Sequence, residues 1–205
     1  MQKDEKVFGG AGNGDRQTPR SAVLMPFALS VVLVVLDQVS KAIILRTIPE
    51  ESIGLRLAND FLWIVNTRNL GIAFSIGDTL SQVVRIGLFI VLPIIFLVIA
   101  IVYCFKSRTL TTFQRWAIAT IVGGGIGNLI DRIFRPEGVV DFLSFAMYGF
   151  LGYDRFPTFN LADASVTVGA ILLIISGFFS ERRDDSGDLG NTREGKEGKN
   201  DVEKN

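Results

Sequence analysis

The sequence predicts an all-α polytopic membrane protein with four transmembrane helices and a small β-sheet between the first and second helices. Three observations predict this fold class. Of the 205 residues, 48% are hydrophobic, the mean hydropathy is +0.37, and four long apolar segments alternate with polar ones. A helix needs about 20 predominantly apolar residues to cross a bilayer, and these segments approach or reach that length.

The chain divides into three predicted parts. Residues 1–20 are polar, charged and rich in glycine, without a hydrophobic period, so we expect a disordered tail. Residues 21–180 hold the four apolar segments and form the predicted membrane domain. Residues 181–205 are again charged and glycine-rich, and we expect a second disordered tail.

The first apolar segment, residues 21–45, could be mistaken for a secretory signal because a basic flank precedes it. It is long enough to span the membrane, no small-x-small cleavage site follows it, and it contains Asp37 and Lys41. We therefore predict a first transmembrane helix. The two charged residues are spaced i,i+4, so they share a helix face and can pair.

Residues 48–77 alternate weakly and contain β-forming residues such as Trp63, Ile64 and Val65, which predicts a small extramembrane sheet. The second span, residues 86–105, is uncharged throughout. Its internal Pro93 is a residue that membrane helices tolerate.

The third and fourth spans are predicted at residues 116–130 and 164–180. Gly123 and Gly127 form a GxxxG step, which favours close helix packing. Four spans place both termini on one side. Lys and Arg are more frequent in the tails and in the 106–115 turn than in the opposite loops, so the positive-inside rule places the termini in the cytoplasm.

Because successive spans cross the membrane in opposite directions, the polar residues gather near its outer face. Ionisable groups at membrane depth are costly unless paired or hydrated, so they indicate a functional site. Asp141 and Asp163 form its predicted centre, because only Arg132 and Lys41 are available to neutralise them. For Asp37 and Lys41, an ion pair that locks the bundle is an equally good explanation.

Composition excludes several classes of function. The formal charge is zero, which gives no support to nucleic-acid binding. There is no His, which excludes Ser-His-Asp and Cys-His nucleophile schemes and HExxH zinc proteases. Cys104 is the only cysteine and is expected to be a small buried hydrophobe. We predict neither a metal nor a cofactor.

Two close carboxylates that share one proton can hydrolyse a peptide without metal, His or activated Ser. Two alternatives remain open. A transporter or ion pathway would also place Asp, Lys and Arg inside a bundle, although usually through its whole thickness. A Ser-Lys hydrolase would use Ser40 and Lys41, but adjacent helical residues point about 100° apart.

Five short motifs carry a resemblance to a known family. They are Asp37-Gln-Val-Ser-Lys41, Asn69-Leu-Gly-Ile-Ala-Phe74, Gly124-Gly-Ile-Gly-Asn-Leu-Ile-Asp-Arg132, Val139-Val-Asp-Phe142 and Phe159-Asn-Leu-Ala-Asp163. Each motif alone is weak, but the five in this order closely resemble the bacterial lipoprotein signal peptidases (signal peptidase II), aspartic proteases of the inner membrane. The resemblance covers about residues 21–180.

The resemblance implies a periplasmic sheet between spans one and two. With cytoplasmic termini, the predicted site lies near the periplasmic face. We also expect a monomer that works among membrane lipids. The resemblance implies substrates that are diacylglyceryl-modified prolipoproteins, cut just before the modified cysteine. By matching position, Asp141 and Asp163 are the expected catalytic pair. The other matching positions, expected to support the site or bind substrate, are Asp37, Lys41, Asn69, Gly71, Asn128, Arg132, Asn160 and Ala162.

Residues 142–158 are rich in aromatic residues and glycine. Aromatic rings favour the headgroup region, which predicts a membrane-interface belt. A mobile lid over the site is the alternative, because loops often close over active sites.

Overall fold

The structure is a computed structural model that describes residues 20–71 and 81–178. The two predicted tails lie outside these residues, apart from Arg20, the first residue of α1. Within the described residues, four helices are long and apolar enough to cross a membrane: Val23–Thr47, Gln82–Lys106, Thr112–Phe134 and Leu161–Phe178. The predicted four-helix membrane fold is confirmed.

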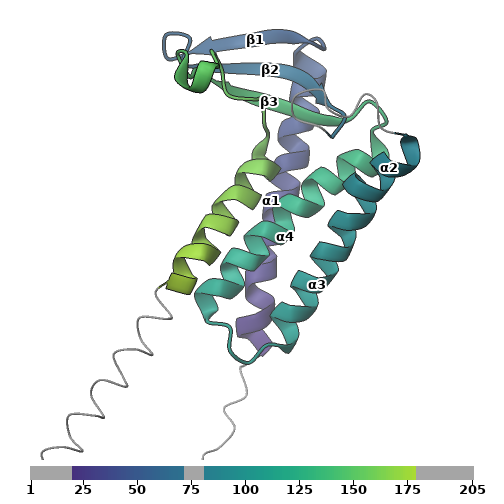
Figure 1. The fold of residues 1–205 in the computed structure, drawn as a ribbon, viewed down its shortest axis with the longest axis vertical. Helices are drawn as coiled ribbons and strands as arrows, with labels where there is room; N and C mark the ends of the chain where they lie inside the picture. Colours follow the sequence, from purple (N-terminus) through teal and green to yellow (C-terminus); the bar gives the residue numbers. More distant parts are fainter. Residues whose placement is uncertain (1–19, 72–80, 179–205) are drawn as a thin grey trace, which may run out of the picture.

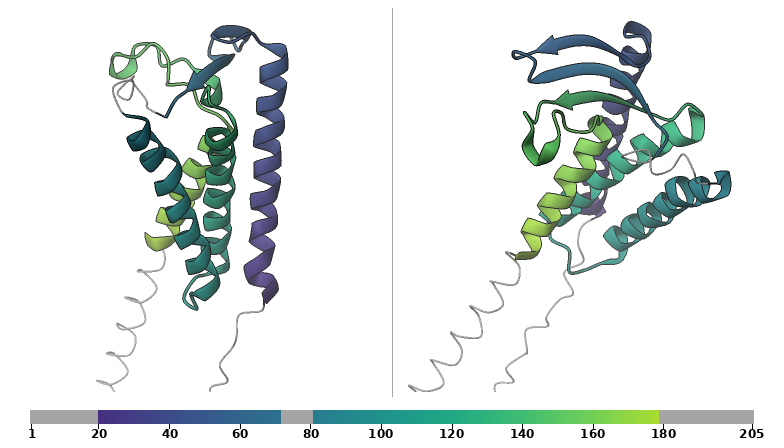
Figure 2. Two further views of the ribbon diagram at one scale, coloured as in Figure 1. Left: turned by 90° about the vertical axis from the view of Figure 1, so that its right-hand side faces the viewer. Right: turned by 45° about the horizontal axis from the view of Figure 1, so that its top comes forward.

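The helices run alongside one another, and a sheet lies across one end of the bundle (Figures 1 and 2). α1 (Arg20–Thr47) begins at the opposite end, which is also where the C-terminal helix, Leu161–Phe178, ends (Figure 1). Both ends of the membrane domain therefore lie on the same side of the bundle.

The sheet is antiparallel, in the order β1, β2, β3. The segment between α1 and the second span supplies β1 (Ser52–Leu57) and β2 (Leu62–Asn69). The third strand, β3 (Val139–Phe145), follows the third membrane helix, so the sheet is not confined to the predicted segment. β3 is mostly buried and lacks the polar alternation that marks a half-exposed strand.

The second span is built from α2 (Gln82–Ile86), the π-helical turn η2 (Gly87–Val91) and α3 (Leu92–Lys106). Pro93 is the second residue of α3 and has no backbone N–H, so the carbonyl of Phe89 loses its α-helical donor. Arg132, on another helix, donates to this carbonyl at 3.2 Å and so compensates for the loss.

α4 (Thr112–Phe134) is the central helix of the bundle. Half of the residues in its most apolar stretch are buried (50%). In the other three spans at most 22% of the corresponding stretch is buried. Gly124 permits this packing, since a Cβ there would overlap the backbone oxygen of Ala162 on the C-terminal helix. At Gly127 a Cβ would lie 2.7 Å from Oδ2 of Asp37. Both glycines are needed for close approach.

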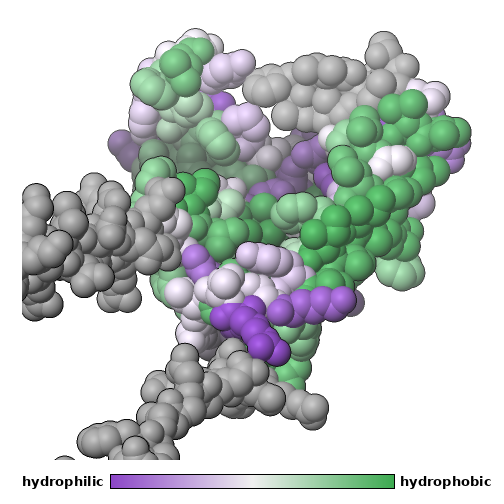
Figure 3. Space-filling view, turned by 60° about the horizontal axis from the view of Figure 1, so that its bottom comes forward, coloured by the Kyte–Doolittle hydropathy of each residue, from purple (hydrophilic) through white to green (hydrophobic). Residues whose placement is uncertain are grey.

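Arg115 belongs to α4 rather than to the turn before it, and its side chain is buried. It donates to the carbonyls of Cys104 and, at 2.8 Å, Ser107, which end α3. Figure 3 shows hydrophobic side chains over the sides of the helices and hydrophilic ones at this end of the bundle. Arg115 thus supplies hydrogen-bond donors to the carbonyl groups at the C-terminal end of α3.

The aromatic segment that was predicted as one loop from residue 142 begins as the last part of β3. Residues 146–158 then fold back along β3, with a short 3₁₀ turn η3 (Phe150–Gly152) at the tip. Tyr148, Phe150 and Leu151 are at least 65% exposed. Neither the interface belt nor the lid is tested by this arrangement, and both remain predictions.

Candidate active site

Asp141 lies on β3, the strand that follows α4, and not on a membrane helix. Gly138 allows the chain to turn from α4 into the strand with φ of 110°. In the sheet Asp141 pairs with Thr67 of β2, whose hydroxyl donates to the Asp141 carbonyl at 3.2 Å. The side chain is 1% exposed, so its carboxyl group is held in a dry environment.

Asp163 lies in the first turn of the C-terminal helix, and Asn160 caps that turn. The Asn160 side chain accepts from the backbone N–H of Asp163 at 2.9 Å, and Asp163 accepts from the backbone N–H of Asn160 at 3.1 Å. This reciprocal pair is a capping box, which explains the i,i+3 spacing of the two residues. The carboxyl group therefore has a fixed position.

The returning loop brings Asn160 beside β3. The backbone N–H groups of Phe142 and Leu143 both donate to the Phe159 carbonyl, at 3.0 and 2.9 Å. Asn160, the next residue, then donates through Nδ2 to Oδ1 of Asp141 at 2.7 Å. Because Asn160 also binds Asp163, one buried asparagine bridges the two carboxyl groups.

Two further asparagines complete the network. Asn128 of α4 donates to Oδ1 of Asp163 at 2.6 Å and accepts from Asn160 at 3.1 Å. Asn69 of β2 donates to Oδ2 of Asp141 at 3.0 Å. The amide of Asn69 is itself oriented by the backbone N–H of Gly71, at 2.9 Å. Both carboxyl groups are thus held by amide donors from separate elements.

Burial raises the pKa of Asp141 to about 6, and the nearby Asp163 carboxylate acts in the same direction. Hydrogen bonds from Asn69 and Asn160 and the charge of Lys41 oppose this rise in pKa. Asp141 can therefore hold a proton at mildly acidic pH. A carboxylic acid beside a second carboxyl group is the arrangement required for acid–base peptide hydrolysis.

Beneath the two carboxyl groups lies a fully buried ion cluster. Lys41 contacts Asp37 and Asp131, each at 2.8 Å, and donates to Asn128 at 3.0 Å. Asp37 in turn accepts from the backbone N–H of Ala162 at 3.0 Å. The predicted pairing of Asp37 with Lys41 is confirmed, and the cluster connects α1, α4 and the C-terminal helix.

Comparison with known proteins identifies the family. The family model described as signal peptidase II matches residues 29–179. The chain is 40% identical over 158 residues to the lipoprotein signal peptidase of Treponema pallidum, covering 77% of this chain and 85% of that protein. The lipoprotein signal peptidase of Borrelia hermsii is 40% identical to this chain over 171 residues, which cover 83% of this chain and 97% of that protein.

The chain belongs to the signal peptidase II family. A solved bacterial membrane enzyme at 2.3 Å resolution has the same arrangement, with a TM-score of 0.65 and 34% identity. The similarity covers 77% of this chain and 89% of that one. The sequence interpretation of the family is therefore correct.

Two supporting residues of the site, Gln38 and Thr67, were missed in the sequence, and Asp131 was noted only as part of a motif. Asp131 is fully buried and binds Lys41 and Arg135. Gln38 donates to Asp131 and to the Gly127 carbonyl, each at 3.0 Å, and Thr67 supports Asp141. Spacing gives a signal for Asp131, which precedes Arg135 by four residues on α4. No sequence signal marks Gln38 or Thr67, since their partners lie on other elements.

Arg132 is not hydrogen-bonded to either carboxyl group. Its Nη1 donates to the Phe89 carbonyl at 3.2 Å, the group left without a helical donor by Pro93, and its guanidinium lies 5.3 Å from the Phe89 ring centroid. It lines a cavity of about 470 Å³ beside the site, together with Asn69, Gln82 and Arg85 among others.

One of the two alternatives from the sequence, the Ser-Lys hydrolase, finds no support in the geometry. Ser40 donates to the Asp37 carbonyl at 2.8 Å, whereas the Lys41 ammonium binds Asp37 and Asp131. Within residues 20–71 and 81–178, no group of three or more Asp, Glu, Cys or His side chains is arranged to hold a metal ion.

Proposed function

We propose that Asp141 and Asp163 are the catalytic pair of this signal peptidase II, which removes signal peptides from prolipoproteins in the bacterial inner membrane. The observation that carries the assignment is the Asn160 bridge, because it binds Asp141 through its side chain and Asp163 through its backbone. Asn69, which donates to Asp141, also lines the adjoining cavity, so the bridged pair lies close to a space that a substrate can enter.

The proposed reaction uses one proton shared by the pair. Asp163 takes a proton from a water molecule as the water oxygen attacks the scissile carbonyl carbon. Asp141, whose raised pKa favours the neutral acid, gives its proton to the carbonyl oxygen. Collapse of the tetrahedral intermediate returns that proton to Asp141, and Asp163 protonates the leaving nitrogen. A carboxyl group and an amine are the products, and the pair regains its starting state.

The other family positions have supporting roles in this proposal. The position of Asp163 and its helix is fixed by Asn128, Asn160 and Ala162. The ion pair of Asp37 with Lys41 holds the membrane helices together below the catalytic pair. Asn69 and Gly71 orient Asp141 from the sheet. Arg132 faces the adjoining cavity and, as a permanent donor, suits a carbonyl or anionic group rather than proton transfer.

The substrate and the membrane orientation follow from the family and from the charge pattern. We propose that the enzyme cuts diacylglyceryl-modified prolipoproteins just before the modified cysteine, as a monomer. The excess of Lys and Arg in the tails and in the turn before α4 supports cytoplasmic termini. The pair then lies near the periplasmic face, where water enters from outside and the substrate helix approaches from the lipid.

Asparagine substitutions test the catalytic pair. Asp141→Asn and Asp163→Asn keep the volume but remove the titratable proton, so cleavage of a lipid-modified precursor should fall by about 10³-fold or more. The matched control is Asp154→Asn, the same chemical change at an exposed position of the loop. Gel-shift cleavage of the precursor by purified, correctly inserted variants is the measurement. Near wild-type turnover by either variant would remove the aspartic mechanism.

A further inference from the structure

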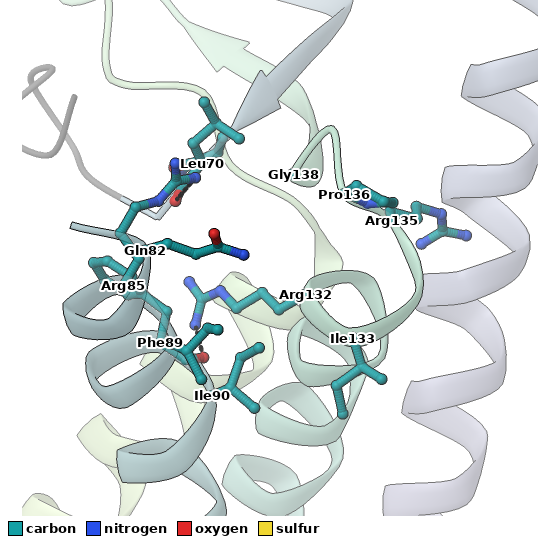
Figure 4. A pocket seen from close by; sticks show the side chains of 12 residues that line it. Leu70, Gln82, Arg85, Phe89, Ile90, Arg132, Ile133, Arg135, Pro136 and Gly138 are labelled. Atoms are coloured by element: carbon teal, nitrogen blue, oxygen red, sulfur yellow. Dashed lines mark hydrogen bonds between the residues drawn. The ribbon is translucent and has the colours of Figure 1, made fainter. Parts of the chain in front are cut away.

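A basic cavity lies beside the catalytic pair, between the second span and the end of α4. Its volume is about 470 Å³. In Figure 4 the side chains of Gln82, Arg85 and Arg132 point into a common space, while the guanidinium of Arg135 points away from it toward α1. No acidic residue is among its described lining residues, so the arginines give the cavity a positive charge.

The two arginines are held in place but retain donors for a ligand. Arg85 donates to the Leu70 carbonyl at 3.4 Å and Arg132 to the Phe89 carbonyl at 3.2 Å. The Nε of Arg132 is buried and has no hydrogen-bond partner among the described residues. A buried donor without an acceptor is costly, so an acceptor from outside the chain would stabilise this site.

The remaining wall of the cavity is apolar and continues onto the membrane-facing surface. It consists of Leu70, Ile86, Phe89, Ile90 and Ile133. Ile86 is 44% exposed and Ile133 is 50% exposed, and both belong to helices that can span the membrane. A ligand in the cavity would therefore meet cationic donors on one side and a path into the acyl-chain region on the other.

We propose that this cavity binds the phosphate group of an anionic phospholipid, with its acyl chains along Ile86 and Ile133. Arginine forks bind phosphate through paired, charge-assisted hydrogen bonds. Basic pockets between membrane helices bind lipid headgroups in this way. A net negative headgroup is favoured over a zwitterionic one, because the described lining offers no carboxylate for an ammonium group.

The lipid site adjoins the catalytic site through Asn69, which lines the cavity and also donates to Asp141. The phospholipid and the precursor would share Arg132. Lipid binding does not depend on the catalytic assignment, and Asp141→Asn should bind phospholipid like the wild type. Failure of one proposal is thus distinguishable from failure of the other.

The test measures thermal unfolding of the purified full-length protein in a neutral detergent, followed by tryptophan fluorescence. Phosphatidylglycerol, phosphatidylcholine and diacylglycerol with identical acyl chains are titrated separately, and inorganic phosphate forms a fourth arm. Of the four compounds, phosphatidylglycerol should raise the midpoint temperature of unfolding most. Arg85→Gln should weaken its apparent affinity about 10-fold, as expected for the loss of a charge-assisted hydrogen bond.

Arg46→Gln is the matched control, because Arg46 is an exposed cation in the last turn of α1 and does not line the cavity. It should leave the lipid response unchanged. Equal responses to phosphatidylglycerol and phosphatidylcholine, or to diacylglycerol, would overturn headgroup recognition. A response to inorganic phosphate alone would indicate a small-anion site. A lack of response to all three lipids would end the proposal.

Discussion

At the scale of single residues, the protonation of Asp141 is set by two opposing effects. Burial raises its pKa to about 6, and the hydrogen bond from Asn69 holds the pKa below the value that burial alone would give. In the proposed mechanism Asp141 must carry the proton. Activity should therefore decline as the pH rises through about 6, when this proton is lost.

Replacing Asn69 should shift the alkaline limb of the pH profile, which is the range in which activity declines as the pH rises. Asn69→Ala removes a donor that stabilises the ionised form of Asp141, so the pKa rises further and the limb shifts to higher pH. The measurement is kcat/KM against pH, whose limb position is independent of any general loss of activity. Asn66→Ala is the control, since Asn66 lies on the same strand but donates to the Ile48 carbonyl. An unmoved limb in Asn69→Ala would contradict the role of Asp141 as the acid.

At the scale of elements, the separation of α4 from the C-terminal helix depends on Gly124. Gly124→Ala would place a Cβ against the backbone oxygen of Ala162, which cannot move as a flexible side chain can. Overpacking of this kind typically costs about 1–3 kcal/mol. We expect a lower unfolding midpoint and a larger loss of cleavage, because Asp163 is displaced from Asn128.

The control for this substitution is Gly177→Ala. A Cβ at Gly177 would meet no atom within 4 Å, so the same added methyl group should leave both the midpoint and the cleavage rate near wild type. Equal effects of the two alanines would show that helix propensity, not packing, decides the outcome.

The elements also show how far sequence reasoning reaches. All four membrane helices could be predicted, because length and apolar character are local properties. The strand β3 could not be predicted. Its apolar residues pair with β2, which lies about 70 residues earlier in the chain, and such distant pairing leaves no local sequence pattern. Asp141 was accordingly found by its motif, but its position on a strand was not predicted. Gln38 and Thr67 stayed hidden for the same reason, because their partners are distant in the chain.

At the scale of the whole molecule, the buried ion cluster connects three membrane helices beneath the catalytic pair. Lys41 is fully buried and lies 2.8 Å from each of Asp37 and Asp131. The position of the C-terminal helix depends on this cluster, because Asp37 accepts from the Ala162 backbone. Removal of the single ammonium group therefore affects more than one pairwise contact.

Lys41→Met preserves most of the side-chain volume but leaves two buried carboxylates facing each other with less positive charge. Breaking a buried pair in this way typically costs about 3–5 kcal/mol. The unfolding midpoint in detergent should fall strongly, and cleavage should fall with it because Asn128 loses its donor from Lys41.

The matched comparison is Arg56→Met in the sheet. Arg56 and Asp60 form an ion pair at 3.8 Å with both side chains more than half exposed (58% and 57%). Exposed pairs contribute about 0–1 kcal/mol, so this substitution should change the midpoint little. If Lys41→Met were as mild as Arg56→Met, the buried cluster would not determine the helix arrangement. The position of Asp163 would then have to come from the capping box, the hydrogen bond from Asn128 and the packing at Gly124.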